Sequence, residues 1–276
     1  MPDRDPQADA AADIRARIDT STPHSARFWN YFVGGKDNYE KDRELGDHIK
    51  EIHPGLVDVA RLSRLFLGRA VRHLATERGI RQFLDIGTGL PTADNTHEVA
   101  QRVAPDSRIV YVDNDPLVLA HARALLTSTP EGETAYIDAD LYAPEAILES
   151  ASATLDLSRP VALMILNTLG HVGDYGQARE LVARLMAGLP SGSHLVISDS
   201  TATSEGMIAA SDAYNKSGAI PYHVRGVEEI GGFFDGLELV APGVVQVTRW
   251  RPDSGSDTES EDATPVDAYG AVARKP

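Results

Sequence analysis

Two glycines and an aspartate stand where they could hold a nucleotide-like ligand. The apolar run RQFLDI (residues 81–86) is followed directly by Gly87, Thr88 and Gly89. A glycine-rich turn between a strand and a helix lets the backbone approach a ligand closely and directs free amides toward it. Asp113 ends the next apolar run, 24 residues after Gly89. A carboxylate there can accept hydrogen bonds from both hydroxyls of a ribose, so the pattern predicts a ribose-containing ligand.

The residues around this turn favour S-adenosylmethionine over a dinucleotide. A dinucleotide motif would place a third small residue at Thr92, and Pro91 removes an amide that a pyrophosphate could use. Asp113 would repel the 2′-phosphate of NADP. S-adenosylmethionine carries no phosphate and needs fewer helix amides. An NAD-dependent oxidoreductase and a non-catalytic S-adenosylmethionine-binding protein, such as a sensor, remain the alternatives.

Further polar residues follow the third and fourth apolar runs. The run ending IDAD offers Asp138 and Asp140 to the amino group of an adenine, although both could instead cap the helix that begins near Pro144. His171 lies just beyond the fourth run, PVALMIL, and is the candidate general base. The competing interpretation is a surface or capping histidine. Methyl transfer needs a base only when the acceptor must lose a proton.

The elements that must position these residues alternate along the chain. Five apolar runs predict buried strands at residues 81–86, 107–113, 134–140, 160–166 and 193–198, with helices between them. This alternation predicts a doubly wound α/β domain over residues 81–251, ending in a hairpin-like pair, GLELVAPG and VVQVTRW. Residues 13–80 are predicted to be helical. Arg61, Arg64 and Arg72 are expected on a solvated helix face, opposite an apolar stripe.

Composition limits the function classes. The chain has 276 residues and a formal net charge of −15, which argues against nucleic acid as a partner. It has no cysteine, so disulfides and a cysteine nucleophile are excluded. We expect no metal site, no membrane span and a cytoplasmic location. Residues 1–12 and the acidic residues 252–276 are predicted to be disordered tails. The oligomeric state is not indicated.

Several long motifs identify a family. The segments YFVGGKDNYEKDRE, FLDIGTGLPTADNTHEVAQ and RIVYVDNDPLVLAHARALL resemble the S-adenosylmethionine-dependent methyltransferase family whose members carry GGKDN and FLDIGTGLPT. The resemblance runs from about Ser25 to Pro252. It implies a class I methyltransferase fold, which is a Rossmann-like sheet of seven strands with the last strand antiparallel, plus a helical amino-terminal extension. It also implies S-adenosylmethionine as cofactor and leaves the acceptor unassigned.

The resemblance also assigns residues to parts of the cofactor. It implies that Asp85 and the turn through Gly87 and Gly89 line the methionine end, and that Asp113 holds the ribose. The remaining implied contacts are Asn114 beside the adenine, Ala139 or Asp140 at the adenine edge, and Asn167 facing the methyl donor. Relatives tend to carry paired histidines after the fourth strand, where this chain reads Gly170-His171. They often place another histidine after the fifth strand, where this chain reads SDST.

The segment RFWNYFVGGKDNYEKD combines aromatic and polar residues. We interpret it as a lid over the donor that shapes the acceptor pocket, with Lys36 and Asp37 reaching the cofactor and Tyr31 taking part in catalysis. Asn38 belongs to the same polar set. The alternative is a helix packed on the domain through Trp29 and Phe32, with GGKDN as a helix stop and cap. The acidic charge and this segment together favour a methyltransferase acting on a small-molecule acceptor.

Overall fold

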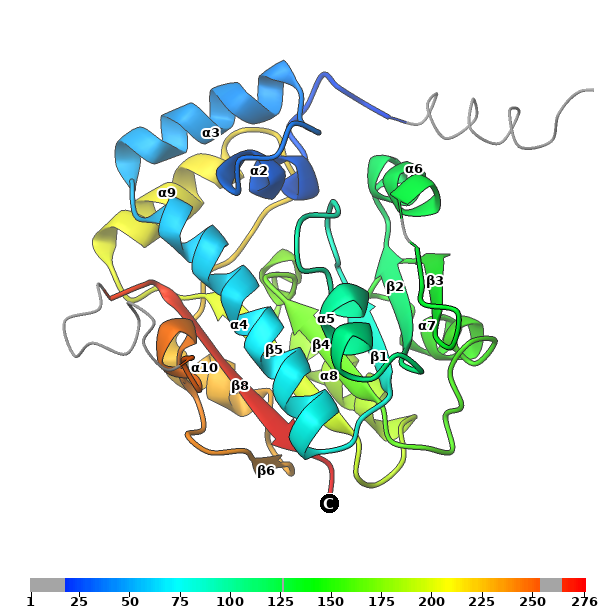
Figure 1. Cartoon of the computed structure of the whole chain (residues 1–276). Helices are drawn as coiled ribbons and strands as arrows, with labels where there is room; N and C mark the ends of the chain where they lie inside the picture. Colours follow the sequence, from blue (N-terminus) through cyan, green and yellow to red (C-terminus); the bar gives the residue numbers. More distant parts are fainter. Residues whose placement is uncertain (1–17, 126, 254–264) are drawn as a thin grey trace, which may run out of the picture.

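The computed structural model describes residues 18–125, 127–253 and 265–276. Its centre is a single mixed sheet in the order β3-β2-β1-β4-β5-β8-β6, with β7 also paired to β8 (Figure 1). The five predicted parallel strands are confirmed as β1 (Gln82–Ile86), β2 (Arg108–Asp113), β3 (Glu133–Asp138), β4 (Ala162–Leu166) and β5 (His194–Ser200). The chain leaves β1 for β2 on one side and reaches β4 on the other. This reversal of strand order is where doubly wound sheets bind ligands.

The carboxyl-terminal strand corrects two predictions. β8 (Ala268–Arg274) runs antiparallel between β5 and β6 (Glu238–Leu239), so residues 268–274 are not part of a disordered tail. The predicted hairpin is also wrong, because β6 and β7 (Val245–Gln246) each pair with β8 and the next residues form a 3₁₀ turn, Val247–Arg249. The acidic segment before β8 made this short, alanine-rich strand hard to recognise in the sequence. Residues 254–264 and the predicted tail 1–12 lie outside the described residues.

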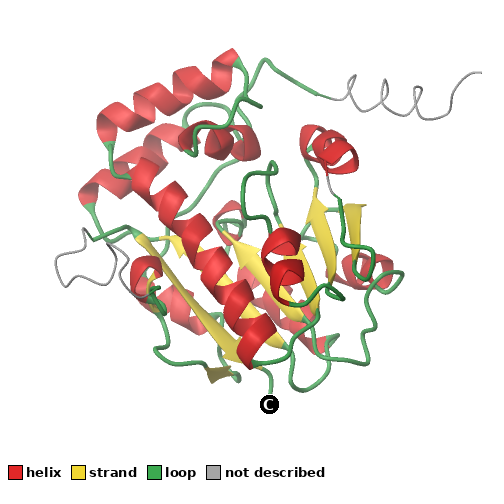
Figure 2. Ribbon diagram, in the orientation of Figure 1, coloured by secondary structure: helices red, strands yellow, loops and turns green. Residues whose placement is uncertain are grey.

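Helices cover both faces of the sheet because neighbouring strand residues point to opposite sides. On β1, Phe83 packs on one face and Leu84 on the other. The first face carries α4 (Leu56–Glu77) and α5 (Thr96–Val103), and the second carries α7 (Pro144–Ala151), α8 (Tyr175–Ala187) and α10 (Val227–Gly232) (Figure 2). The helix α6 (Pro116–Leu125) follows β2 and packs beside β3. The expected fold class is therefore confirmed, and the described residues form a sheet of eight strands rather than seven.

Three helices gather over one end of the sheet. α2 (Ser25–Phe32) and α3 (Glu40–Ile52) pack together, and α9 (Glu205–Asn215) packs against α3 (Figure 1). The ring of Phe28 lies 4.6 Å from that of Phe32 and 5.2 Å from that of Tyr214, which joins α2 to α9. The predicted domain boundary at residue 80 remains a prediction. α4, which ends just before that residue, belongs to the helix layer that covers the sheet. Its predicted apolar stripe is buried there: Val59, Leu62, Phe66, Ala70 and Leu74.

Candidate active site

A cavity of about 230 Å³ lies beyond the carboxyl ends of β1, β2 and β4, beneath α2. Sequence reasoning found much of its lining. The predicted residues that the cavity brings together are Asp85, Gly87, Thr88, Gly89, Asp113, Asn114, Ala139, Asp140, Asn167 and His171. They lie at or just beyond the carboxyl ends of four neighbouring strands, β1, β2, β3 and β4, so the sheet brings them together.

The glycine turn after β1 cannot be built from other residues without strain. Gly87 and Gly89 have φ angles of 71° and 65°, in the left-handed region that side chains disfavour. A Cβ atom on Gly87 would also collide with the side chain of Thr168. The Gly87 amide donates to the Val112 carbonyl at 2.8 Å, which joins the turn to β2. The turn therefore brings bare backbone to the cavity wall.

Two backbone amides fix the orientation of the Asp113 carboxylate. Its Oδ2 accepts from the Gly89 amide at 2.9 Å, and its Oδ1 accepts from the Asp115 amide at 2.9 Å. Burial raises the pKa of Asp113, while these two amides favour its charged form. Each carboxylate oxygen has lone-pair capacity left for a second donor. The pair of hydroxyls on a ribose would supply such donors.

Asp85 and Arg64 place opposite charges in the same cavity. Asp85 is 5% exposed, and burial raises its pKa from 3.8 to about 6, although the Thr96 hydroxyl donates to it at 2.6 Å. The prediction of a solvated face is wrong for Arg64, because its side chain lines the cavity. Its Nη2 donates to Asn95 at 3.4 Å, and its Nε has no hydrogen-bond partner among the described residues. Burial lowers the pKa of Arg64, and Asp85 opposes this effect. Arg61 and Arg72 are exposed as predicted.

A helical repeat could have revealed Arg64. Ala60, Ser63, Arg64 and Leu67 all line the cavity, and their i, i+3, i+4, i+7 spacing places them on one face of α4. Arg61 does not line the cavity and is exposed. The apolar stripe of α4 drew attention to the sheet-facing side and away from this edge.

Asn167 is held in an unusual conformation at the end of β4. Its φ angle is 51°, which is uncommon for a residue with a side chain. Its amide donates to the Ser198 carbonyl at 2.7 Å, and its Oδ1 is buried without a hydrogen-bond partner in the described chain. Such strain and an unsatisfied acceptor are typical of a ligand site. At the other end of the cavity, Asn114 donates to Asp140 at 3.1 Å.

His171 has a defined tautomer when neutral. Its Nδ1 lies 2.9 Å from the Pro221 carbonyl, which can only accept, so Nδ1 carries the proton and Nε2 is left as a base. Burial lowers the pKa of His171 below its usual value. The ring also packs edge-on against Tyr222, with centroids 5.0 Å apart. His171 is thus neutral at pH 7 and able to accept a proton.

Gly170, which precedes His171, lies against a buried tyrosine. A Cβ atom on Gly170 would lie 2.6 Å from the Tyr222 ring, so Tyr222 fills the space that a larger residue would need. The Tyr222 hydroxyl donates to Asp199, within the SDST segment. Burial raises the pKa of Asp199 to about 6. A residue larger than glycine at position 170 would therefore displace the ring that bonds to Asp199.

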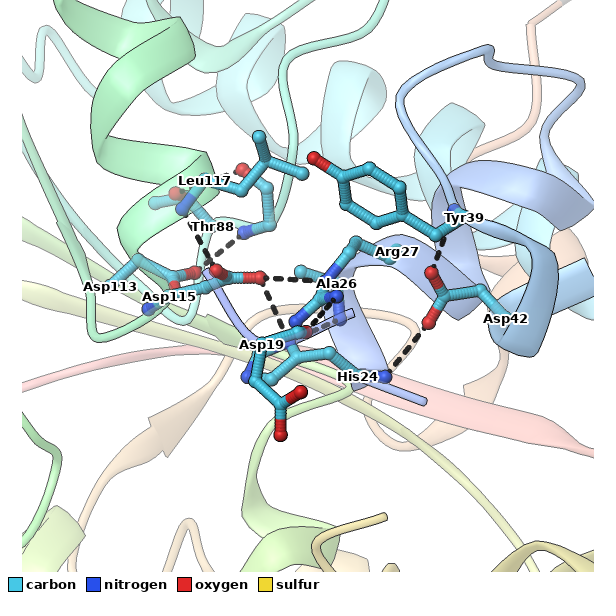
Figure 3. A network of polar contacts seen from close by, with 11 residues as sticks. Asp19, His24, Ala26, Arg27, Tyr39, Asp42, Thr88, Asp113, Asp115 and Leu117 are labelled. Atoms are coloured by element: carbon cyan, nitrogen blue, oxygen red, sulfur yellow. Dashed lines mark hydrogen bonds and ion pairs between the residues drawn. The ribbon is translucent and has the colours of Figure 1, made fainter. Parts of the chain in front are cut away.

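The segment before α2 fastens this helix over the cavity, a contact that the sequence did not predict. The His24 Nδ1 lies 3.0 Å from Asp115, and its amide donates to Asp42 at 2.9 Å (Figure 3). Arg27 adds a contact to Asp115 at 3.5 Å and donates to the Asp19 carbonyl at 2.7 Å. Because Asp115 follows β2, the network joins the amino-terminal helices directly to the loop that holds Asp113.

The residues assigned to the lid lie elsewhere. Tyr31, Lys36 and Asp37 do not line the cavity, because Tyr31 faces α3 and donates to Asp47, while Lys36 is exposed. The Asp37 amide donates to Asn30 at 3.0 Å, so GGKDN is a loop wrapped around Asn30. It ends α2 and precedes α3, as the alternative interpretation held. The opposite face of α2 lines the cavity instead, through Ala26, Trp29, Asn30 and Val33.

A small apolar extension, with a volume of about 30 Å³, opens beside the main cavity. Trp29 and His171 line both spaces. The extension is enclosed by α2, α3, α9 and the loop before α10, and its other walls include Phe28, Leu56, Met207, Tyr214 and Tyr222. Within the described residues no group of three or more histidines and acidic residues could hold a metal, and no helix is long and apolar enough to cross a membrane.

Comparison with known proteins identifies a family for the chain. The model of a family described as S-adenosyl methyltransferase matches residues 11–276. A DUF574 family protein from Streptomyces avermitilis MA-4680 is 48% identical, with a TM-score of 0.89, covering 94% of this chain and 100% of its own. A Thermobifida fusca YX protein, provisionally described as a methyltransferase, is 40% identical, with a TM-score of 0.86 and coverage of 93% and 96%.

A more distant likeness concerns the fold alone. The plantazolicin methyltransferase BpumL is 12% identical, with a TM-score of 0.51 and coverage of 97% and 99%. No functionally curated protein matches the chain. The family match spans nearly the whole sequence, and the cavity lies where class I methyltransferases hold their donor. The chain therefore belongs to the S-adenosyl methyltransferase family, and it is an S-adenosylmethionine-dependent methyltransferase.

Proposed function

We propose that the chain methylates a small-molecule acceptor that lies between the donor and the apolar extension, with His171 as the base. The supporting observation is that His171 and Trp29 line both the donor cavity and this extension. An acceptor seated there would lie beside the donor and beside the free Nε2 of His171. The aromatic walls favour a compound with a flat or apolar body.

The residues of the main cavity fit the donor by chemistry. Asp113, with its two backbone amides behind it, would accept the ribose hydroxyls. Asp85 would pair with the α-ammonium of the methionine portion, and Arg64 with its α-carboxylate, because these two side chains carry the complementary charges. The glycine turn would let this portion lie against the backbone.

Two further groups would hold the ends of the donor. Asn114, Ala139 and Asp140 would surround the adenine, and Asp140 would accept from its amino group. The buried Oδ1 of Asn167 would face the positively charged sulfur, an attraction that also gives this orphaned acceptor a partner. Tyr31, Lys36 and Asp37 have no role in this proposal.

The reaction is an in-line displacement for which the protein supplies geometry and a proton acceptor. S-adenosylmethionine supplies a methyl group on a sulfonium, and the sulfur leaves as a neutral thioether. His171 Nε2 would take the proton as the acceptor's oxygen or nitrogen forms its bond to the methyl carbon. The Pro221 carbonyl would then hold the resulting imidazolium through Nδ1. Trp29 and α2 would exclude water from the reacting atoms.

The proposal is tested by incubating the full chain with isotope-labelled donor and a metabolite extract. We expect a product that is heavier by one CH₂ unit and carries the label, identified by mass spectrometry. His171→Asn keeps a donor near the Pro221 carbonyl but loses the base, so kcat should fall about 100-fold or more while donor affinity stays constant. His171→Gln, which retains an acceptor near the Nε2 position, is the matched variant.

Two outcomes would contradict the proposal. Tight donor binding without a methylated product from any extract would indicate the non-catalytic alternative. An unchanged kcat in His171→Asn would remove the base from the mechanism. We keep the cytoplasm as the proposed location, since turnover requires a continuous supply of S-adenosylmethionine.

A further inference from the structure

A second cavity of about 270 Å³ lies at the opposite edge of the sheet, where β1 and β5 begin and β8 ends. It is separate from the donor cavity and shares no lining residue with it. Its lining contains four arginines, Arg78, Arg81, Arg159 and Arg274, and no acidic residue. This concentration of positive charge stands out in a chain of net charge −15.

The four arginines differ in how far their charge is already matched. Arg274 pairs with Glu238 at 2.9 Å, and Arg81 lies 3.4 Å from Asp106 and donates to the Ala75 carbonyl at 2.9 Å. Arg78 donates to the neutral ring of His73 at 3.4 Å. Neither Arg78 nor Arg159 has a carboxylate within 4 Å in the described ranges. Two guanidinium groups on the wall therefore have charge available for a ligand.

His194 provides an independent sign of a ligand. It is the first residue of β5, it is 3% exposed, and it lies opposite Arg274 in the sheet register. Neither of its ring nitrogens makes a hydrogen bond of good geometry in the described structure, although the Gly192 carbonyl lies near the ring. A buried imidazole nitrogen that lacks a well-formed hydrogen bond costs about 1–3 kcal/mol, so the retention of His194 beside four arginines needs a reason.

The electrostatics around His194 are those of a site that lacks its anion. Burial, followed by Arg78 and Arg274, lowers the pKa of His194 to about 4, with the Gly192 carbonyl opposing them and His73 adding to them. An anion among these groups would reverse the repulsion and give the imidazole an acceptor. A neutral or cationic ligand would do neither.

We propose that this cavity binds the phosphoryl group of a small metabolite, held by Arg78, Arg159 and Arg274 with His194 beside them. The planar guanidinium fork matches phosphate oxygens in pairs, and three or four such groups suit a dianion better than a single carboxylate. The concave shape and the strongly acidic remainder of the protein favour a small ligand over a nucleic-acid backbone. The site is independent of the methyl acceptor.

Calorimetric titration of the full chain with inorganic pyrophosphate tests this site. We expect saturable binding at one site per chain, weakened about tenfold by Arg159→Ala and by Arg78→Ala, because each removes a charge-assisted contact. Arg61→Ala is the matched control, since Arg61 is likewise exposed but lies outside both cavities. The affinity should be unchanged in Asp113→Ala.

Nuclear magnetic resonance of the histidine rings gives a second readout that needs no variant to fold. Pyrophosphate should move the His194 ring signals and leave those of His171 in place. The proposal is overturned by absence of binding, by equal affinities in the wild type and both arginine variants, or by a ring signal of His194 that does not respond. Tighter binding of citrate than of pyrophosphate would overturn the phosphoryl assignment.

Discussion

The carboxyl ends and the amino ends of the parallel strands, which form the carboxyl edge and the amino edge of the sheet, carry opposite charge patterns. At the carboxyl edge, three aspartates and one arginine, Asp85, Asp113, Asp140 and Arg64, line the donor cavity. At the amino edge, four arginines and a buried histidine line the second cavity. Helix ends explain part of this contrast, since α5 and α6 begin at the first edge and α4 ends near the second. Helix amino termini favour acidic neighbours and carboxyl termini favour basic ones.

Helix dipoles do not explain why some buried polar atoms lack a hydrogen-bond partner. A dipole attracts charge to an edge, but it does not leave a buried acceptor such as the Asn167 Oδ1, or a buried ring such as His194, without a hydrogen bond. An excess of charge of one sign at an edge of the sheet can follow from the fold alone. Buried polar atoms without hydrogen-bond partners beside that charge indicate a ligand.

The largest effect is expected at the carboxyl edge. Asp113→Ala removes the acceptor for two ribose hydroxyls, each worth about 1.5–3 kcal/mol, so donor affinity should fall about a thousandfold. Calorimetry with S-adenosylmethionine measures this change. Asp106→Ala, an exposed aspartate at the amino edge, is the control and should bind normally. Donor affinity within tenfold of wild type in Asp113→Ala would refute the ribose assignment.

A smaller loss is expected from the single arginine of that cavity. Arg64→Ala should weaken donor binding about 10- to 100-fold, because one charge-assisted pair with the methionine carboxylate is lost. Arg61→Ala, three residues earlier and exposed on α4, should have no effect. Decarboxylated S-adenosylmethionine offers a sharper check, since it should bind wild type and Arg64→Ala equally well. A preserved difference with this ligand would place the interaction elsewhere.

Donor affinity should also depend on pH through Asp85. Its pKa of about 6 means that the carboxylate takes up a proton in the free protein as the pH falls below about 6. The α-ammonium of the donor stays charged there, so affinity should fall by up to about tenfold per pH unit. Asp85→Asn should bind more weakly at pH 7.5 and lose this dependence. A flat profile in the wild type would exclude the pairing.

Asp85 also makes the free energy of unfolding depend on pH. The folded-state pKa of Asp85 lies above its ordinary value of 3.8, so the folded chain holds the proton more tightly than the unfolded chain. Its contribution to the free energy of unfolding is therefore greatest below pH 4 and declines as the pH rises toward 6. Unfolding in urea across this range should show a steeper decline in wild type than in Asp85→Asn.

The smallest effect tests whether the two edges are independent. Arg159→Ala should change donor affinity less than about twofold, because Arg159 lies at the far edge and is screened by solvent. The measurement is the same calorimetric titration with S-adenosylmethionine. A larger change would mean that the two cavities are coupled through the sheet.

Local signals in the sequence predicted the parts of the site that local structure builds. Gly87, Gly89 and Asp113 lie at strand ends, where the backbone itself determines their position. Arg64, His24 and Trp29 were not predicted as site residues, since their placement depends on how α2 and α4 pack over the sheet. Tyr31, Lys36 and Asp37 were predicted as site residues because a polar loop that wraps around Asn30 resembles a ligand-binding loop in sequence. In the structure they lie outside the cavity lining.

The position of β8 has a consequence for how the chain acquires its structure. β5 offers one edge for pairing until residues 268–274 have been synthesised, and β6 and β7 have no partner before then. An exposed strand edge is a template for aggregation. A nascent chain that has made everything up to the acidic segment thus holds a nearly complete donor cavity beside an unprotected seam.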